Sequence, residues 1–229
     1  RRFSIGIEGF QTYSDNNYWM DNVLIVDEEN SKPGIINTKR GRARRFNDTF
    51  DSKLGRINLG VRDLAWADEI ILSSSISDVY REWQHDIIPE NPWGEARSEE
   101  ESWSSAITWK NSFGNGKLDV NVTGGLLKNQ FHFIDTASST YYWDGNSEPF
   151  FGRKGESSNL TNGTLPEVTL NSVFARSSWV YSLSAKHTLN LTTLTTQDRF
   201  RIRNFALSEL RQEGLDERQA LLKNYAGLS

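Results

Sequence analysis

Hydrophobic and polar residues alternate one by one along several stretches of the chain. In KLDVNVTGGL (residues 117–126), Leu118, Val120, Val122 and Leu126 share one parity, and most of the residues between them are polar. Successive side chains of a β-strand point to opposite faces of a sheet, so this stretch predicts a strand with one apolar and one polar face. The same alternation recurs within residues 3–8, 56–62, 70–77, 103–110, 173–184 and 189–192. The chain is therefore expected to be all-β, with about seven strands.

The connections between these strands alternate in length. Residues 63–68, 113–117 and 185–187 are short connections, and 113–117 reads Phe-Gly-Asn-Gly-Lys, a hairpin signal. The connections at about 14–49, 83–102 and 135–168 are long, although loops above about 12–15 residues are uncommon in compact domains. An antiparallel up-and-down meander with tight turns at one end and long loops at the other is typical of transmembrane β-barrels of the outer membrane.

The two ends of the chain indicate how much of a barrel is present. The tail after Phe205 is expected to carry a helical stretch, with Ser208 and Asp216 as candidate N-caps. An odd number of strands leaves open edges, whereas single-chain bacterial barrels have an even number. The chain also begins Arg-Arg-Phe without a signal peptide. We therefore expect residues 1–229 to be a partial barrel from within a longer protein; a processed mature chain is the alternative.

Composition narrows the class of protein. The chain is 36% hydrophobic and 24% charged, with a mean hydropathy of −0.61, and it contains no apolar run of about 18 residues that could form a transmembrane helix. The strands of a membrane barrel escape this criterion because only every second residue contacts lipid. The net charge of −4 argues against a nucleic-acid partner. The absence of cysteine excludes disulfides and thiolate metal sites.

The alternation alone does not decide what each face contacts. In a barrel, the apolar residues Leu118, Val120 and Val122 would meet lipid, and a charge at Val120 would cost about 2–4 kcal/mol if that residue lay near the midplane. The polar face, which would line the lumen, includes Arg56, Asn58, Arg62, Asp119, Asn121 and Arg176. Seven strands also suit a soluble β-sandwich, but sandwiches normally use Greek-key connections rather than a meander.

Three runs of sequence resemble a known family. YSDNNYWM (13–20), RARRFNDTFDS (42–52) and WADEIILSSS (66–75) are similar to the barrel of TonB-dependent outer-membrane receptors of the Bacteroidetes type. In that family an N-terminal plug domain sits inside a barrel of about 22 strands. The resemblance covers most of the chain as barrel strands and loops, and no plug domain is visible in residues 1–229.

The resemblance implies a transport function. A protein of this family sits in the outer membrane of a Gram-negative bacterium, surrounded by outer-membrane lipid, and imports a scarce nutrient such as an iron chelate, cobalamin or an oligosaccharide. Energy comes from the TonB complex through the plug, so a chain without a plug could not couple to it. The resemblance implies no enzyme activity and no cofactor. The sequence leaves open the cargo and whether a surface lipoprotein caps the loops.

Aromatic residues supply candidate sites in two places. Trp66, in a short turn, and Trp109, near the next turn, suit an interfacial girdle, although ordinary packing would also explain them. Aromatic residues beside amides suit stacking on and hydrogen bonding to sugars or chelates, although they could instead pack the loops on one another. The candidate substrate-binding residues are Trp93, Tyr141, Tyr142 and Trp143, and Tyr18–Trp19 is a similar pair.

Charged residues give weaker signals. The basic residues Lys39, Arg40, Arg42, Arg44 and Arg45 are expected to contact lipopolysaccharide phosphates, or else to form a solvated loop edge or to pair with Asp48 and Asp51. The acidic run 99–101 lacks the spacing of a calcium loop, and the three histidines are scattered, so we expect no metal site. We find no catalytic motif. The remaining alternatives are a soluble carbohydrate-binding β-sandwich and, after it, a secreted β-rich hydrolase.

Overall fold

The computed structural model describes residues 2–32, 34–85, 90–157, 162–206 and 219–229. These residues form strands, turns and loops, so the protein is all-β as predicted. In the part of the chain described, no helix is long and apolar enough to cross a membrane.

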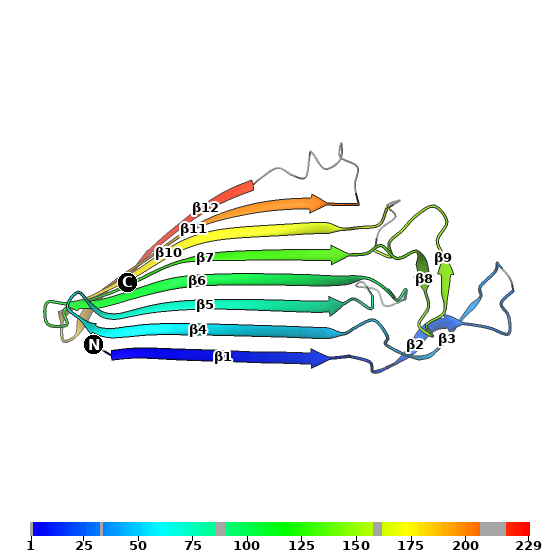
Figure 1. Ribbon diagram of the computed structural model, residues 1–229, viewed down its shortest axis with the longest axis horizontal. Coiled ribbons are helices and arrows are strands. Elements are labelled where there is room, and N and C mark those ends of the chain that lie inside the picture. Colours follow the sequence, from blue (N-terminus) through cyan, green and yellow to red (C-terminus); the bar gives the residue numbers. More distant parts are fainter. Residues whose placement is uncertain (1, 33, 86–89, 158–161, 207–218) are drawn as a thin grey trace.

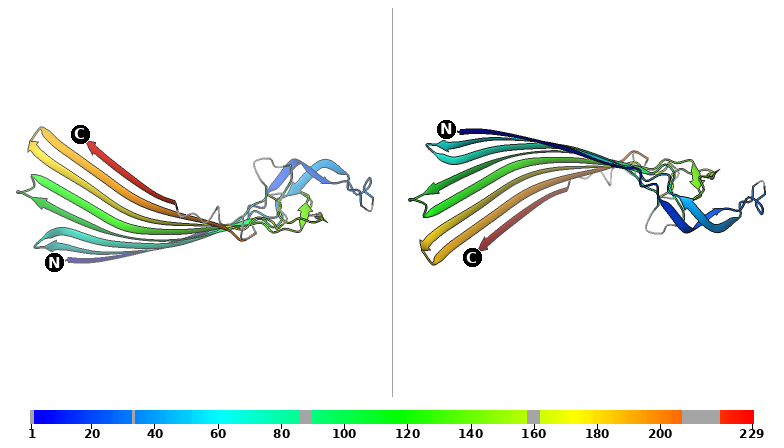
Figure 2. Two further views of the ribbon diagram at one scale, coloured as in Figure 1. Left: turned by 90° about the horizontal axis from the view of Figure 1, so that it is seen from above. Right: turned by 90° about the horizontal axis from the view of Figure 1, so that it is seen from below.

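One large antiparallel sheet dominates the structure (Figure 1). Its strands, in spatial order, are β1 (Arg2–Ser14), β4 (Phe50–Leu64), β5 (Ala67–Glu82), β6 (Arg97–Phe113), β7 (Leu118–Ile134), β10 (Pro166–Ser184), β11 (His187–Asn204) and β12 (Gln219–Leu228). Spatial order follows chain order, which is the meander predicted from the alternating connection lengths. Figure 2 shows a single twisted layer, with no second large sheet against either face in the described ranges.

The long connections gather at one end of the sheet and the tight turns at the other (Figure 1). Two small hairpins lie within the long connections: β2 (Trp19–Val26) with β3 (Thr38–Arg44), and β8 (Ser139–Tyr141) with β9 (Ser147–Pro149). The period-two pattern did not reveal these hairpins because their strands are short or interrupted. We call the two ends the loop end and the turn end.

The expected helix after Phe205 is wrong where it can be assessed. Gln219–Leu228 is strand β12, which pairs with β11 from Leu191↔Leu228 to Phe200↔Gln219. A strand there satisfies backbone groups of β11 that a helix would leave unpaired. The proposed caps Ser208 and Asp216 lie outside the described residues. The sheet therefore has eight described strands rather than seven, and the argument from an odd strand number no longer applies.

The strand register gathers most of the apolar positions predicted from the alternation on one face, which we call the apolar face, although Ile71, Phe174 and Leu194 lie on the other. Three consecutive cross-strand rows on this face contain no charged residue in any of the eight strands, and we call them the charge-free rows. The rows read Phe3–Val61–Ile70–Trp109–Val122–Ser177–Thr193–Ala226, Ile5–Leu59–Leu72–Ile107–Gly124–Ala175–Thr195–Asn224, and Ile7–Ile57–Ser74–Ser105–Leu126–Val173–Gln197–Leu222.

The opposite face, which we call the polar face, carries the charges at the same level. All six residues predicted for it share this face: Arg56, Asn58, Arg62, Asp119, Asn121 and Arg176. The Glu69 carboxylate forms ion pairs with the Arg62 guanidinium and the Lys110 ammonium group, each with an N–O distance of 2.6 Å. Between these charges lie small residues such as Gly60, Ser73 and Ala106. The prediction of two chemically different faces is confirmed.

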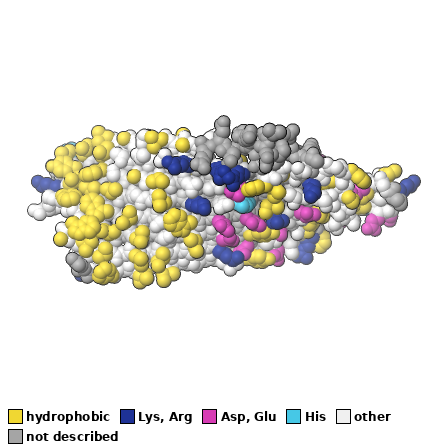
Figure 3. Space-filling view, turned by 45° about the horizontal axis from the view of Figure 1, so that its top comes forward, with side chains coloured by type: hydrophobic (Ala, Val, Ile, Leu, Met, Phe, Trp, Pro, Cys, Tyr) yellow, Lys and Arg dark blue, Asp and Glu magenta, His cyan; other side chains and the backbone are white. Residues whose placement is uncertain are grey.

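Toward the loop end, the apolar face becomes charged. The cross-strand row next to the charge-free rows on their loop-end side is Gly9–Gly55–Ile76–Trp103–Lys128–Asn171–Arg199–Ala220. The following row is Gln11–Lys53–Asp78–Glu101–Gln130–Thr169–Arg201. In Figure 3, hydrophobic side chains gather toward the turn end, and acidic and basic side chains lie farther toward the loop end. Each long strand therefore has two segments with different surface chemistry.

Candidate functional site

Aromatic side chains from separate elements meet around a cavity at the loop end of the polar face. The cavity has a volume of about 640 Å³, within the range of small-molecule sites. We call it the aromatic hollow, and its lining residues are Arg45, Asp48, Arg81, Trp83, Gln84, His85, Trp93, Phe131, Phe133 and Pro166. Phe131 and Phe133 come from β7, Trp83 follows β5, and Trp93 lies in the connection to β6.

The rings of the aromatic hollow are held edge to face. Phe133 contacts Trp83 at a centroid distance of 6.5 Å and Trp93 at 6.4 Å, with interplanar angles of 73° and 63°. The Arg81 guanidinium carbon lies 4.0 Å from the centre of the Trp83 ring, which is cation–π geometry. Among the described residues, no carboxylate oxygen lies within 4.0 Å of Arg81 nitrogens. The hollow therefore combines aromatic surfaces with a cation that can attract an acidic or polarised ligand group.

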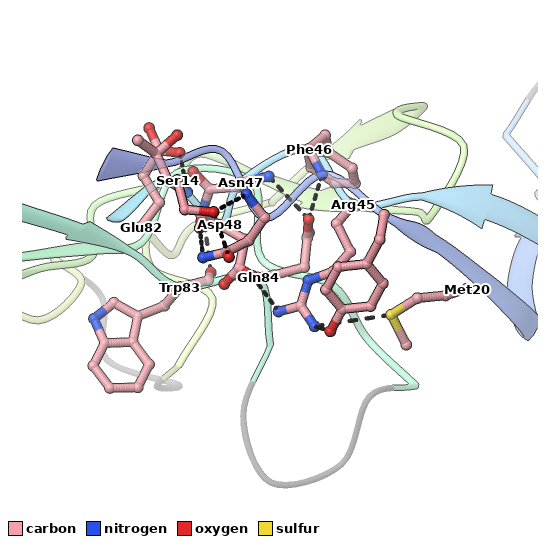
Figure 4. Close-up of polar contacts among 12 residues, drawn as sticks. Ser14, Met20, Arg45, Phe46, Asn47, Asp48, Glu82, Trp83 and Gln84 are labelled. Atoms are coloured by element: carbon pink, nitrogen blue, oxygen red, sulfur yellow. Dashed lines mark hydrogen bonds and ion pairs between the residues drawn. The ribbon is translucent and has the colours of Figure 1, made fainter. Parts of the chain in front are cut away.

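Two buried side-chain amides hold the loops that carry these rings (Figure 4). Gln84, 1% exposed, accepts the backbone N–H groups of Phe46 at 2.6 Å and Asn47 at 2.9 Å and donates to the Trp93 carbonyl at 3.1 Å. The Asn47 amide donates to the carbonyls of Trp83 at 3.1 Å and Ala96 at 3.2 Å. The loops lack the regular backbone hydrogen bonds of a sheet, and these side-chain bonds take their place. They therefore fix Trp83 and Trp93 relative to one another.

An ion pair forms another part of the wall. Arg45 contacts Asp48 at 2.9 Å, with both side chains nearly buried, and donates to the Tyr18 hydroxyl at 2.7 Å (Figure 4). The pairing of the basic segment with Asp48 is thus confirmed, whereas Asp51 pairs with Lys53 at 2.8 Å instead. Lys39, Arg40 and Arg42 pair with other acids, Asp27, Glu90 and Asp21. Contact with lipopolysaccharide remains a prediction.

Glu156 fastens the Trp93 loop from the other side. Its carboxylate accepts the backbone N–H groups of Gly94 at 2.6 Å, Glu95 at 3.0 Å and Ala96 at 3.2 Å. Asp135, fully buried, accepts the backbone N–H groups of Glu156 and Ser157 at 2.7 and 2.6 Å. Burial raises the pKa of Glu156 to about 7, more than its three backbone donors lower it, and the nearby Asp135 adds to the increase. Glu156 is therefore a titratable link between the two loops.

Of the four predicted binding residues, Trp93 lines the aromatic hollow. Tyr141 lies against the same loop from outside the hollow: its hydroxyl donates to Glu95 at 2.6 Å, and its ring leaves no room for a side chain at Gly94, where a Cβ would come within 2.5 Å. The bond to Glu95 raises the pKa of Tyr141 to about 12. Packing of loop on loop explains the Tyr141 contacts.

Tyr142 and Trp143 also join loops to one another. Trp143 is 1% exposed and packs with Val23 and Ala43 of the β2–β3 hairpin. The Tyr142 hydroxyl donates to Glu148 at 2.9 Å; burial, followed by this carboxylate, raises the pKa of Tyr142 to about 12. The structure places neither residue in the lining of the hollow, and ligand binding by them remains an untested prediction.

No family model matches the chain, and no curated protein matches it. Evidence for a function therefore comes from the site itself.

Sequence reasoning missed most of the hollow. Phe131 and Phe133 flank His132 on β7, and both lie on the polar face, in the same parity as Asn121. The sequence did carry a signal for these two residues. Aromatic side chains at positions that alternate with the apolar ones cannot belong to the apolar face, so they indicate another role. Arg81 lies near the end of β5 and Trp83 follows that strand, and their proximity to β7 follows only from the register.

The histidines form no metal centre in the described structure. His132 lies 3.7 Å from Glu167, whereas His85 is near the Trp143 ring, at 6.0 Å between ring centres. No group of three or more histidine or carboxylate side chains is placed to hold a metal ion among the described residues. The residues of the hollow can bind a ligand by stacking, hydrogen bonding and charge.

Proposed function

We propose that residues 1–229 form part of the wall of an outer-membrane barrel that imports a small nutrient, as in TonB-dependent receptors. The observation that carries this proposal is the set of charge-free rows, which face one side of a single-layer meander while arginines, lysines and acids occupy the other side. Burying this uncharged face in lipid would remove apolar side chains from water. The charged face would line the lumen.

The height of the apolar face fits a membrane. Trp103 marks its loop-end border and Phe113 its turn-end border, both on β6 and ten positions apart. At about 3.4 Å per residue this is about 34 Å along the strand, and a tilt of about 40° reduces it to about 26 Å across the bilayer. Membrane barrels carry an apolar band of about 25 Å between two aromatic girdles.

Aromatic side chains cluster at the turn-end border as a girdle requires. Trp66 is 62% exposed, and Phe113, Trp179 and Tyr181 are each exposed by two-fifths or more. The Trp109 indole N–H donates to the Trp66 carbonyl at 3.3 Å. Such rings prefer the level of lipid headgroups because one end is apolar and the other can form hydrogen bonds. The predicted girdle is thus supported by exposure and position.

The aromatic hollow then has a natural role. Strands β4–β7, β10 and β11 contain 15–19 residues, more than the 9–11 or so needed to cross a bilayer. The extra length would raise the hollow above the membrane, on the lumen side and beneath the loops. A cargo that entered from outside and passed the loops would meet Trp83, Trp93 and Arg81. Iron chelates and oligosaccharides both offer flat or polar surfaces suited to such a site.

A ligand panel tests this role. Detergent-solubilised protein would be titrated with iron chelates, cobalamin and oligosaccharides while its tryptophan fluorescence is followed. The variant Trp93→Ala should weaken binding of the active ligand by about tenfold, because one aromatic contact is lost. The control Trp66→Ala alters the turn end and should bind normally. Equal affinity in wild type and Trp93→Ala would contradict the assignment of the hollow.

A carbohydrate-binding sandwich would also use aromatic residues, but its apolar sheet face would be covered by a second sheet. The exposed single layer favours the barrel.

A further inference from the structure

A second cavity adjoins the aromatic hollow at the loop end. It has a volume of about 520 Å³, and we call it the polar recess. Asn16 and Tyr18 line the polar recess and not the aromatic hollow. The residues that line both cavities are Arg45, Asp48, Arg81 and His85. The two cavities therefore share one charged wall, with aromatic rings on one side of it and amide and hydroxyl groups on the other.

Arg81 gives the shared wall a positive charge that the described residues leave unbalanced. Arg45 and Asp48 neutralise one another at 2.9 Å, whereas Arg81 forms no ion pair with any described residue. The strand register explains the difference, because the residues directly opposite Arg81 are Phe50 on β4 and Ser98 on β6, neither of them acidic. The shared wall thus carries a net positive charge that favours an anion.

Contact with Trp83 orients the Arg81 guanidinium. The guanidinium carbon lies over the indole, 4.0 Å from the ring centre. A guanidinium stacked on an aromatic ring keeps the N–H groups at its edge available for a bidentate pair with a carboxylate. The Trp83 indole N–H donates to the Ser98 hydroxyl at 2.9 Å, which fixes the ring that supports the guanidinium. Arg81 is therefore held ready for a planar acidic group.

Arg45 indicates a missing acceptor at the same wall. Its terminal nitrogens contact Asp48 at 2.9 Å and the Tyr18 hydroxyl at 2.7 Å (Figure 4). Its Nε atom is buried and has no hydrogen-bond partner in the part of the chain that the structure describes, and a buried donor without an acceptor is costly. A ligand oxygen at the shared wall would supply an acceptor. Both arginines of this wall thus have donors that the described protein groups do not use.

We propose that the aromatic hollow binds a ring that carries a carboxylate, as in a uronic acid residue of an oligosaccharide or an aryl carboxylate. The ring stacks on Trp93, because the Trp83 ring is in contact with Arg81. The carboxylate accepts N–H groups of Arg81 at the wall shared with the polar recess. The inference rests on the proposed role of the aromatic hollow as a cargo site, and it selects acidic over neutral cargo.

Matched acidic and neutral ligands test for the carboxylate. Solubilised protein would be titrated calorimetrically with digalacturonate and its methyl ester, and separately with benzoate and benzamide. Each pair keeps the ring and removes the negative charge. In at least one pair the acid should bind about tenfold more tightly, since charge-assisted hydrogen bonds to a guanidinium contribute about this factor. The pair that shows the preference identifies the sugar or the aryl source.

Variants separate the contribution of charge from that of stacking. Arg81→Gln should weaken the acid by about tenfold and leave the neutral ligand unchanged, so that the preference is lost. Trp93→Ala should weaken both ligands alike, because stacking of the ring does not require the carboxylate. Arg97→Gln removes the same charge from the apolar face of β6 and should keep the preference. Circular dichroism would confirm that each variant retains its sheet.

Equal affinity for acid and neutral ligand in both pairs, no binding of either acid, or a preference that survives Arg81→Gln would overturn the carboxylate assignment. If Trp93→Ala still weakens binding of a neutral ligand, the aromatic hollow remains a cargo site and only this inference fails. Affinities that neither Trp93→Ala nor Arg81→Gln alters would place the ligand elsewhere, and would overturn the proposed role of the hollow together with this inference.

Discussion

The turn-end and loop-end segments of the same strands differ in what their two faces carry. On β6, Ile107 and Trp109 lie on the apolar face of the turn-end segment, and Glu99 and Glu101 occupy the same parity toward the loop end. On β7 the polar face changes in the reverse direction, from Asp119 and Asn121 to Phe131 and Phe133. Parity fixes the face of a side chain, but position along the strand fixes its environment.

This reversal places a binding surface where the strands approach the loops. The polar face gains aromatic side chains at the aromatic hollow, which in the proposed receptor would contact a cargo in water. A strand with one uniform pattern along its length would not provide this surface.

The largest effect is expected from a substitution that puts a charge on the apolar face of the turn-end segment. Ile107→Arg places a charge at the centre of the charge-free rows and should destabilise the protein in lipid vesicles by about 2–4 kcal/mol. Thr108→Arg puts the same charge on the polar face of the same strand and should cost far less. Denaturant unfolding in vesicles measures both, and equal costs would contradict the facing. Val120 lies near the turn end and is 3% exposed, so Ile107 is the better position for this test.

A smaller effect is expected at the loop end, where buried side-chain amides hold the loops. Gln84→Ala leaves the N–H groups of Phe46 and Asn47 and the Trp93 carbonyl without partners, at a cost of about 1–3 kcal/mol. Hydrogen exchange of the loop amides should accelerate, while that of β6 and β7 near the turn end stays unchanged. The control Gln11→Ala removes an exposed amide that bonds Asp51 and should leave loop exchange as in wild type. Unchanged exchange in Gln84→Ala would show that the amide does not hold the loops.

The smallest effect concerns pH. Because the pKa of Glu156 is raised from its ordinary value of 4.5 to about 7, the folded loops retain a proton that the unfolded chain releases at lower pH. The stability associated with that proton is complete below about pH 4.5 and is lost as pH rises through about 7. Thermal unfolding of the loops should therefore shift downward over this interval in wild type.

Glu156→Gln should remove that part of the pH dependence, because the amide does not titrate. Glu28→Gln, in an exposed loop, should keep the wild-type slope. Identical slopes in wild type and Glu156→Gln would exclude Glu156 as the titrating group.

The sheet was predictable from the sequence because alternation and turn residues are local signals. The alternation in KLDVNVTGGL and the similar stretches predicted both the strands and the face of each side chain, and the short connections predicted the meander. β12 was missed because QALLKNYAGL contains good helix formers, and pairing with β11 overrides that propensity. Within the aromatic hollow, Trp93 was the one binding residue predicted; the parity of Phe131 and Phe133 was a further signal, but the meeting of Trp83, Phe133 and Gln84 depends on register and on buried amide bonds.

Site-specific quenching tests the membrane facing most directly. A bimane label would be attached to Ile107→Cys or to Thr108→Cys, neighbours on β6 that lie on opposite faces, with the protein in vesicles. We predict that brominated acyl chains quench the label at position 107 and not at 108, and that aqueous iodide gives the reverse. Equal quenching of both labels by iodide, with none by the brominated chains, would contradict the barrel.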